Sequence, residues 1–459
     1  MNTNSLWIVN ALILTQNSSR EVLRGHIEIN DSRIVAIHDQ EQVVPAKVRT
    51  LDASGLVLMP GLIQPHIHLC QTLFRNLADD LELMDWLSQR IWPLESAHDD
   101  ESLYLSAQLG IQELLASGTT CILDMATVHH TEAVLRAVRD SGIRANVGKC
   151  LMDHPETTPI YMRQDPDVAL AEARELFNQW HGSENGRIQV SYAPRFVVAC
   201  SEYLLEQVRD LAEEQGAIIH THSSENEKEV ELVRSLVGQE NAAYLHSIGL
   251  MSERLVLAHC IWLNEAEMGH LQTSGTHVVH CPSSNLKLAS GFAKVPEMLA
   301  QGINVALAAD GAPCNNNLSA LQEMRLAALL HKPGRGPRTL PASAVLDMAT
   351  RNGAKAMGLA DQIGSLEVGK QADLIALDLN QPANFLPYHE DEIPPYEQLA
   401  SAIVYASQPS HVKWTLVAGE MVAIDGRALR IPARDLEPRR IRDIQRKLMQ
   451  RAAELQASV

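Results

Sequence analysis

The sequence predicts an α/β fold in which a (β/α)8 TIM-like barrel is joined to a small β-sandwich domain formed from both chain ends. Two observations carry this expectation. Residues 60–365 alternate strand-like and helix-like segments in eight repeats, and short β runs separated by turns lie before and after them. We therefore expect three parts: a composite β domain from residues 1–59 and 366–430, a barrel over residues 60–365, and a C-terminal helical tail over residues 431–459.

The two chain ends carry the β runs. Strands are expected near the N-terminus at residues 6–14, 22–29, 33–37 and 57–59, with a hairpin turn at Asn30-Asp31. Further strands are expected at residues 372–379 and 412–424, on either side of a Pro-rich loop from Pro382 to Pro395. We infer that the two groups pair with each other, the alternative being two unconnected β appendages.

The middle of the chain repeats a helix followed by a strand. After a first strand that ends at residue 68, strands are expected at residues 118–124, 144–151, 188–193, 217–222, 255–259, 276–280 and 304–310. The helices before them are expected at residues 101–117, 130–141, 167–180, 203–215, 241–248, 264–274 and 295–301. This size and rhythm fit a closed barrel. A doubly wound sheet is the alternative, but no Gly-x-Gly-x-x-Gly follows an early strand.

Composition excludes several classes of function. Apolar residues make up 46% and charged residues 20% of the 459 residues, which is ordinary for a globular protein. The formal net charge of −18 disfavours nucleic acid and anionic membranes as partners and leaves small molecules. Seven widely spaced cysteines without a Cys-x-x-Cys motif fit free thiols in a reducing compartment. No secretory signal or apolar run of about 18 residues is found, so we expect a cytoplasmic protein.

The stretch from Pro60 to Leu69 is where the candidate site begins. An apolar run over residues 56–59 leads into His66-Ile67-His68, and we expect the whole stretch to form one buried strand. Alternate residues of a strand point to the same side, so the two imidazoles can reach one metal ion. An isolated His-x-His is more often a pair of polar histidines at a strand end, and only further ligands elsewhere change that balance.

Further candidate ligands lie at the ends of later strands. The carboxyl ends of the strands form the functional face of a barrel of this kind. The fifth to eighth strands end, in order, at His220-Thr221-His222, His259, His280 and Asp310. Three histidines and one aspartate form a mixed nitrogen and oxygen set suited to one Zn²⁺ per chain, with Fe²⁺ possible. The expected ligands are His66, His68, His222 and Asp310.

A metal of this kind lowers the pKa of a bound water to about 7. Asp310 could both ligate the metal and accept the water's proton. Glu225, three residues after His222, suits the general acid or base that carries a proton to the leaving group. His259 would polarise the reacting centre or contact the water.

The remaining polar residues of these strands are expected to support the site. His220 and His280 are expected to pack or to orient a ligand. A binuclear site bridged by a modified lysine is the alternative to a single metal ion. The plausible lysine, Lys149, lies on the expected third strand, which is too early in the chain for that role.

Taken together, these residues resemble the amidohydrolase superfamily, and within it the mononuclear branch of aminopurine, cytosine and triazine hydrolases. The motifs are Pro60-Gly61-Leu62-Ile63, His66-Ile67-His68, His222-Ser223-Ser224-Glu225, His259, His280-Cys281-Pro282-Ser283-Ser284-Asn285, Asp310 and the segment from Gly364 to Leu374. The resemblance covers nearly the whole chain. It implies a zinc-dependent hydrolytic deaminase that forms homo-oligomers, most often dimers.

Two motifs within that resemblance bear on the substrate. Gln71, three residues after His68, and the segment Ala193-Pro194-Arg195-Phe196 are similar to guanine deaminases. By that resemblance Arg195 would donate to the purine O6, Gln71 would bond the ring-nitrogen edge and Phe196 would line the pocket. The alternative for Arg195 is a strand-end arginine that pairs with a loop carboxylate.

Other motifs favour other substrates. The segments from Leu73 to Asp80, from Met84 to Leu87 and from Asp310 to Asn317 are similar to adenosine-type deaminases that act on thioether nucleosides, which adds Trp86 to the expected substrate contacts. Atrazine-type chlorohydrolases share His-x-His-x-x-Gln. The loop Asn315-Asn316-Asn317 could bind substrate or form a turn and helix cap.

We therefore predict deamination of an aminopurine, with guanine converted to xanthine and ammonia as the first choice. In that reaction water attacks the amino-bearing carbon, Glu225 protonates the adjacent ring nitrogen and Asp310 takes the proton of the water. The alternatives are a deaminase of adenosine, S-adenosylhomocysteine or 5'-methylthioadenosine, and an s-triazine hydrolase.

Overall fold

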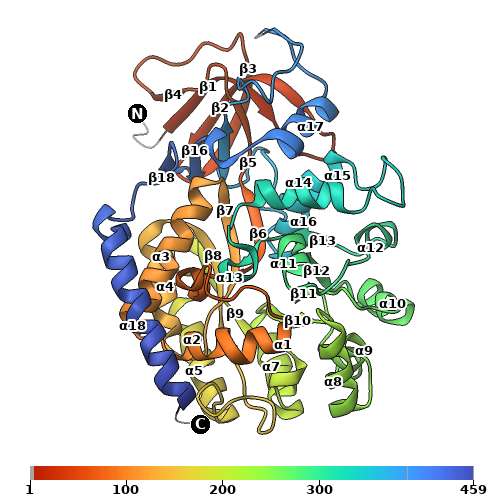
Figure 1. Ribbon diagram of the computed structural model, residues 1–459. Coiled ribbons are helices and arrows are strands. Elements are labelled where there is room, and N and C mark those ends of the chain that lie inside the picture. The colour runs from red at the N-terminus through yellow and green to blue at the C-terminus, as the bar shows by residue number, and fades with distance from the viewer. Residues whose placement is uncertain (1–4, 390, 458–459) are drawn as a thin grey trace.

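The computed structural model describes residues 5–389 and 391–457, which form two nine-stranded sheets. One sheet gathers strands from both chain ends at the top of Figure 1, and the other is the barrel below it. The predicted fold class is confirmed: a parallel α/β barrel with a sheet domain built from the two ends. The residue boundaries expected for the three parts stay a prediction.

The end sheet joins segments more than 300 residues apart in the chain. Its strand order is β18-β17-β16-β15-β5-β1-β2-β3, with β4 paired to β1. The join between the two ends is antiparallel pairing of β15 with β5, in which Leu374 lies opposite Pro60. The strands are β1 (Ser5–Leu14), β2 (Val22–Asn30), β3 (Arg33–Asp39), β4 (Arg49–Asp52), β5 (Val57–Pro60), β15 (Leu374–Leu377), β16 (Val412–Val417), β17 (Glu420–Ile424) and β18 (Arg427–Ala428).

The barrel strands run parallel in the order β13-β12-β11-β10-β9-β8-β7-β6-β14. Their bounds are β6 (Leu62–His68), β7 (Thr119–Met125), β8 (Arg144–Leu151), β9 (Ile188–Pro194), β10 (Ile219–Ser223), β11 (Leu255–His259), β12 (His277–His280), β13 (Val305–Leu307) and β14 (Asp310–Gly311). The eighth strand is split, because β13 pairs with β12 while β14 pairs with β6. Between its two parts Ala309 donates its backbone N–H to Gln64 Oε1 at 2.8 Å, so a side chain of the first strand bonds the interrupted backbone.

One predicted strand is in fact two. The apolar run at residues 57–60 is β5 of the end sheet, whereas His66 and His68 lie on β6 of the barrel. Gly61 separates the two strands, and a Cβ there would lie 2.1 Å from Thr120 Oγ1. Pro60-Gly61 interrupts the apolar run at this joint, and this turn signal marks the place where the two strands divide. The chain therefore passes from one sheet to the other within a single residue.

Helices surround the barrel. The seven helices predicted before strands are present as α3 (Asp100–Ala116), α4 (Thr131–Ser141), α5 (Pro166–Trp180), α7 (Glu202–Gln215), α9 (Asn241–Ser247), α10 (Glu265–Ser274) and α12 (Val295–Ala300). Several others were not predicted: α1 (Leu83–Trp86), α2 (Trp92–Ser96), α8 (Glu227–Val237), α11 (Pro282–Lys287), α13 (Ala312–Asn315), α14 (Ala320–Leu330), α15 (Ala342–Ala349), α16 (Arg351–Ala356) and α17 (Tyr396–Ala406). Short turns of other helix types, η1 (Leu69–Phe74) and η2 (Leu87–Ile91), follow the first barrel strand.

The charged C-terminal helix α18 (Pro438–Ala457) packs along the side of the barrel, the blue helix in Figure 1. Its buried residues Ile444, Leu448 and Ala452 are spaced four apart, which places them on one face. They join a core cluster with Leu73 and Phe74 of η1. Among the described helices, none combines the length and the apolar character needed to cross a membrane.

Candidate metal centre and active site

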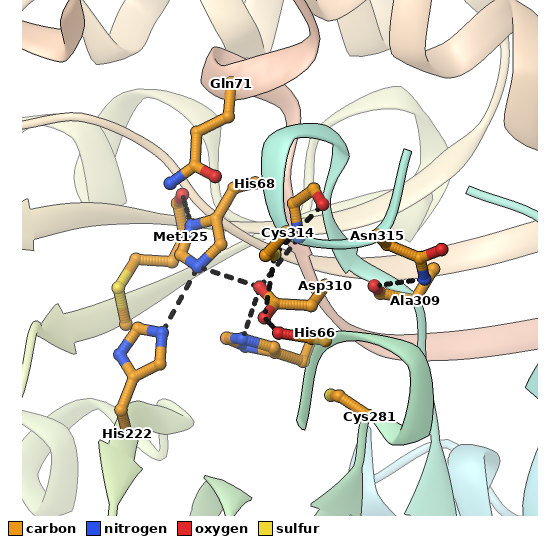
Figure 2. A network of polar contacts seen from close by, with 12 residues as sticks. His66, His68, Gln71, Met125, His222, Cys281, Ala309, Asp310, Cys314 and Asn315 are labelled. Atoms are coloured by element: carbon orange, nitrogen blue, oxygen red, sulfur yellow. Dashed lines mark hydrogen bonds and ion pairs between the residues drawn. The ribbon is translucent and has the colours of Figure 1, made fainter. Parts of the chain in front are cut away.

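Four imidazoles are oriented in the same way at the carboxyl ends of the barrel strands. Each uses Nδ1 to contact the protein, which leaves Nε2 for the common centre, and Figure 2 shows three of the four, His66, His68 and His222. The Nδ1 atoms of His68 and His222 lie 2.9 and 2.7 Å from the carbonyl oxygens of Met125 and Arg195. The other two Nδ1 contacts are His66 with His220 Nε2 at 2.8 Å and His259 with Asn285 Oδ1 at 2.9 Å.

Asp310 brings a carboxylate to the same point. Its Oδ1 lies 3.1 Å from His66 Nε2 and 3.4 Å from His68 Nε2. Ser284 Oγ donates to Oδ2 at 2.7 Å, and the Gly311 N–H donates to Oδ1 at 2.7 Å, so the carboxylate has a fixed orientation. The structure thus brings together the residues predicted as metal ligands.

The donor set fits a divalent metal ion. A carbonyl oxygen accepts only a hydrogen, so His68 and His222 carry theirs on Nδ1, and their Nε2 atoms present lone pairs. Those two Nε2 atoms lie 3.2 Å apart, and the Asp310 carboxylate is beside them. Lone pairs at this separation repel unless a cation lies among them. Ligand atoms of two groups, His66 with His222 and His259, and His66 with His68 and Asp310, lie within 4.8 Å of one another.

Electrostatics keep the imidazoles neutral, the form that binds a metal. Burial lowers the pKa of His66, lowers that of His68 to about 4 and lowers that of His222 well below its usual value. Burial alone would raise the pKa of Asp310, but the interactions with His66, together with those of His259 and His68, outweigh burial and hold that pKa well below its ordinary range. At neutral pH the site is therefore three neutral imidazoles and one carboxylate.

The backbone at these strand ends has an uncommon conformation. Ser224, His259 and Asp310 have φ angles of 52°, 71° and 67°, in the left-handed region that non-glycine residues seldom adopt. Ser224 follows β10, His259 ends β11 and Asp310 begins β14, so all three lie at strand ends that carry candidate site residues. Strain of this kind persists where the surrounding structure enforces it and is concentrated at functional sites.

Glu225 lies beside this group. Its Oε2 is 3.5 Å from His259 Nε2, and the side chain is buried. Burial, followed by the Asp310 and Glu229 carboxylates, raises the pKa of Glu225 well above its usual value. A buried carboxyl with a raised pKa keeps its proton to higher pH, which is the property that a general acid needs.

The four residues predicted as substrate contacts line one small pocket with the site residues: Gln71, Trp86, Arg195 and Phe196. Arg195 does not have a free guanidinium, because its two terminal nitrogens lie 2.6 and 3.3 Å from the carboxylate of Glu95. Gln71 Nε2 also donates to Glu95, at 2.8 Å. The pairing of Arg195 with a carboxylate, expected as the alternative, is thus present, although the partner lies on helix α2 and not on a loop.

Glu95, which bonds two residues of the pocket lining, is a residue that sequence reasoning missed. It is 2% exposed and holds two of the predicted substrate contacts, yet it lies on a short helix with no motif around it. Two buried polar atoms near it have no partner among the described residues, Gln71 Oε1 and Trp86 Nε1. They offer one acceptor and one donor for a ligand.

Helix α1 covers the pocket. The cavity at the site residues has a volume of only about 20 Å³, and Leu83, Trp86 and Leu87 close one side of it. Two acidic residues just before helix α1 form ion pairs with lysines on other helices at the mouth of the barrel. Asp79 pairs with Lys287 of α11, and Glu82 pairs with Lys228 of α8. Room for a molecule larger than water requires this cover to shift.

Other predicted residues take supporting places. His220 contacts His66, as expected for an orienting residue, and His280 is buried with neither ring nitrogen bonded among the described residues. Lys149 donates to the Val128 carbonyl and pairs with Glu172 at 3.1 Å, away from the candidate ligands. In the Asn315–Asn317 loop, Asn315 Nδ2 donates to the Ala309 carbonyl at 2.7 Å, which ties the loop to the broken eighth strand.

This chain is similar to known proteins both in sequence and in structure. A sequence profile of the amidohydrolase family matches residues 57–422. A 5-methylthioadenosine/S-adenosylhomocysteine deaminase of Syntrophobacter fumaroxidans is 39% identical over 428 residues, 92% of this chain and 94% of that protein.

Two solved structures are also similar. One is an adenosine deaminase from Xanthomonas campestris with bound zinc, with 32% identity and a TM-score of 0.88 over 97% of this chain and 98% of that one. The other is the guanine deaminase of Escherichia coli, with 25% identity and a TM-score of 0.79 over 92% and 99% of the two chains. The protein named for guanine is thus the more distant of the two.

Proposed function

This chain belongs to the amidohydrolase family, as its motifs predicted, and from that membership we propose that it is a hydrolytic deaminase of adenosine-type nucleosides. The observation that carries the proposal is the convergence of His66, His68, His222 and Asp310 on one point, with Glu225 and His259 beside it. A metal held there supplies an activated water at neutral pH. Zinc is the proposed metal, with Fe²⁺ as the alternative.

The side chains of this chain divide the proton transfers between them. Asp310 is ionised and its carboxylate faces the imidazoles, so it is placed to accept a proton from the attacking water. Glu225 is buried and favours its protonated form, so it is placed to deliver a proton to the ring nitrogen next to the reacting carbon. His259 Nε2 lies between these two carboxyls, 3.5 Å from Glu225 and 3.9 Å from Asp310, and can stabilise charge that develops there.

Two observations favour an adenosine-type substrate over guanine, the first choice from the sequence. The relative with 39% identity and the solved neighbour with 32% are named for adenosine-type deamination. In addition, each terminal nitrogen of Arg195 donates one N–H to Glu95, so the bidentate fork is occupied by that carboxylate and only single N–H groups remain for a purine O6. Gln71 Oε1 and Trp86 Nε1 remain as unpaired pocket atoms for contacts with the ligand.

A nucleoside needs a pocket of a few hundred cubic ångströms, far more than the cavity of about 20 Å³ beneath helix α1. Substrate binding therefore includes displacement of the cover formed by Leu83, Trp86 and Leu87. The Asp79–Lys287 and Glu82–Lys228 ion pairs, which span the mouth of the barrel, have to loosen in that step.

A substrate panel tests the proposal. Metal-loaded protein is assayed for ammonia release from adenosine, 5'-methylthioadenosine, S-adenosylhomocysteine, 5'-deoxyadenosine, guanine and a chlorotriazine, with the metal content measured on the same sample. We expect about one metal ion per chain and the highest kcat/KM on one of the adenosine-type compounds. A higher kcat/KM on guanine would instead support guanine deamination, the reaction first predicted from the sequence. Release of ammonia from none of the purines would refute deamination.

A further inference from the structure

Behind Glu225 lies a second buried acidic residue that the proposed chemistry does not use. Glu229, in the first turn of helix α8, has an exposed fraction of 0%. Its Oε2 accepts the backbone N–H of Glu225 at 2.6 Å and that of Asn226 at 3.3 Å. Its Oε1 accepts Asn241 Nδ2 at 2.5 Å, so the carboxylate is held from both sides.

The turn that carries Glu225 depends on contacts to both edges of its backbone. The carbonyl oxygens of Ser223 and Ser224 accept the N–H groups of Cys260 and Ile261, at 3.0 and 2.9 Å, which ties one edge to the sixth-strand loop. The N–H groups of the other edge precede helix α8 and have no helical partner. Glu229 supplies the acceptor for them.

A glutamate at this position usually closes a capping box, in which it bonds only the N-cap residue. Helix α10 has such a box, where Glu267 accepts the N–H of its N-cap Asn264 at 2.9 Å. Glu229 also bonds its N-cap, Asn226, but its shorter bond goes one residue further back, to Glu225. A helix cap does not require this extra bond. It holds the backbone of Glu225, whose side chain faces His259.

We propose that Glu229 is a positioning residue, which fixes the Ser224–Asn226 turn so that the Glu225 carboxyl stays at the reacting centre. The proposal rests on the function proposed above, in which Glu225 carries a proton. Glu229 itself is neither a candidate metal ligand nor a lining residue of the pocket. Beside the influence of its charge on the pKa of Glu225, its effect on turnover is transmitted through the backbone of that residue.

Three substitutions at this position separate geometry from charge. Glu229→Gln keeps an acceptor for the two N–H groups, and its amide can face Asn241, whose Oδ1 has no partner among the described residues. Glu229→Asp keeps the charge but is one methylene shorter. Glu229→Ala removes the acceptor. Glu267→Ala is the matched control, because Glu267 is also a buried capping-box residue that bonds the start of α9, through the Ala242 N–H at 3.0 Å.

We expect kcat to fall by about 10²-fold in Glu229→Ala, the size of effect that a small misplacement of a catalytic group produces. Glu229→Asp should also lose kcat, Glu229→Gln should stay close to wild type, and KM should change little in all three. Glu267→Ala should lower the melting temperature without lowering kcat. In a Glu225→Gln background, Glu229→Ala should cause no further loss, because it acts only through that residue.

Amide hydrogen exchange supplies a readout that does not depend on turnover. Faster exchange at residues 224–226 in Glu229→Ala and Glu229→Asp, but not in Glu229→Gln or Glu267→Ala, would support positioning even if no purine proved to be a substrate. Unchanged exchange would overturn it, as would a higher kcat for Glu229→Asp than for Glu229→Gln, or additive losses in the Glu225→Gln background. Absence of deamination by the wild-type protein would instead refute the proposed function.

Discussion

Buried carboxylates hold the candidate site in place. Glu95 accepts bonds from Gln71 and Arg195, and Glu229 accepts the backbone of Glu225 and Asn226. Glu323, on helix α14, accepts from Ser283 Oγ at 2.6 Å and Asn315 Nδ2 at 2.9 Å, and so joins the loops that follow the last two strands. Each of these carboxylates satisfies donors that would otherwise be buried without a partner, a loss that costs about 1–3 kcal/mol per group.

The role of Glu225 is the first prediction at the scale of single residues. Glu225→Gln should lower kcat by about 10²-fold or more, the range that general acid–base groups contribute, because an amide cannot donate the required proton. Metal content should stay unchanged, since Glu225 is not among the proposed ligands. Glu227→Gln, an exposed residue two positions further on, is the control and should keep its activity. Equal kcat values for the two variants would disprove the assignment.

The buried pair of Arg195 and Glu95 leads to a prediction about stability. Arg195→Met should lower the free energy of unfolding by about 3–5 kcal/mol, because it leaves the Glu95 carboxylate buried without its cation. The two side chains are 3% and 0% exposed, so solvent cannot replace the lost partner. Urea denaturation measures the change. The double variant Arg195→Met/Glu95→Gln should recover most of the loss, and a single variant as stable as wild type would contradict the pairing.

Residues at strand ends could be predicted from the sequence, and residues that brace them could not. His66, His68, His222 and Asp310 each follow an apolar strand pattern, and the carboxyl ends of parallel strands meet at one face. Glu95, in contrast, is a single acid within a short helix, and nothing in the local pattern shows which chain segment it will face. Its link to Arg195 spans 100 residues and arises only from the closed barrel.

At the scale of elements, periodicity decided what could be predicted. Helices with a clear polar face, such as α4 and α7, were predicted within one or two residues. Helices α14 and α15 are rich in Ala, Leu and Met on most sides and are largely buried, so the amphipathic pattern is weak. The joint at Gly61 lies at a Pro-Gly pair, a turn signal beside the boundary expected between the β domain and the barrel.

Helix α18 provides the prediction at this scale. Leu448→Ala should lower the free energy of unfolding by about 2–5 kcal/mol, because this 1%-exposed side chain fills the contact between α18 and the barrel. Met449→Ala, at a neighbouring 49%-exposed position, should change it by less than about 0.5 kcal/mol. Thermal and urea unfolding of both variants would measure this.

The same helix is connected to the site. Gln445 of α18 donates to the Leu73 carbonyl at 2.9 Å, and Leu73 belongs to the turn that carries Gln71. A loosened α18 should therefore also raise KM. A Leu448→Ala protein as stable as Met449→Ala would show that α18 is not a packing element.

At the scale of the whole molecule, the chain ends and the barrel are joined covalently at Gly61 and by a buried ion pair. Arg144, at the start of β8, lies 2.7 and 3.0 Å from the two carboxylate oxygens of Asp373, just before β15. The pairing of the chain ends could be inferred because β runs lie at both ends of an α/β middle. This ion pair could not be inferred, since either residue alone reads as an ordinary surface charge.

Buried titratable groups lead to a prediction about the pH dependence of stability. Burial lowers the pKa of His98 and His277 to about 4 and that of His280 to about 3, and raises the pKa of Asp124 and Glu323 to about 7. Between about pH 4.5 and 6.5 the unfolded chain binds protons on the three histidines, while the native protein binds them on the two carboxyls. Over these five groups the unfolded state binds one proton more than the native state, and the histidines of the site, whose pKa values burial also lowers, add to that excess.

The free energy of unfolding should accordingly fall on acidification below pH 6.5, by at least about 1.4 kcal/mol per pH unit, the contribution of one excess proton. Below about pH 4.5 Asp124 and Glu323 bind protons in the unfolded chain as well as in the native protein. They then no longer offset the histidines, so the free energy of unfolding falls more steeply with each pH unit. Urea denaturation between pH 4 and 8 tests this. Glu323→Gln should steepen the slope between pH 4.5 and 6.5, and a stability that rises on acidification would contradict these pKa shifts.

Removal of the metal is the last prediction, and it concerns the whole barrel. The proposed ligands lie on β6, β10 and β14, so a bound ion links the first, fifth and eighth strands, whose ligating residues span positions 66 to 310. Metal binds the native arrangement and not the dispersed ligands, so a hundredfold excess over its Kd should add about 2.7 kcal/mol to the free energy of unfolding. Chelation should therefore abolish turnover and lower the melting temperature, and Zn²⁺ should restore both. His66→Ala/His68→Ala protein should show no such response to chelator, and a wild-type melting temperature indifferent to metal would refute a shared ion at this point.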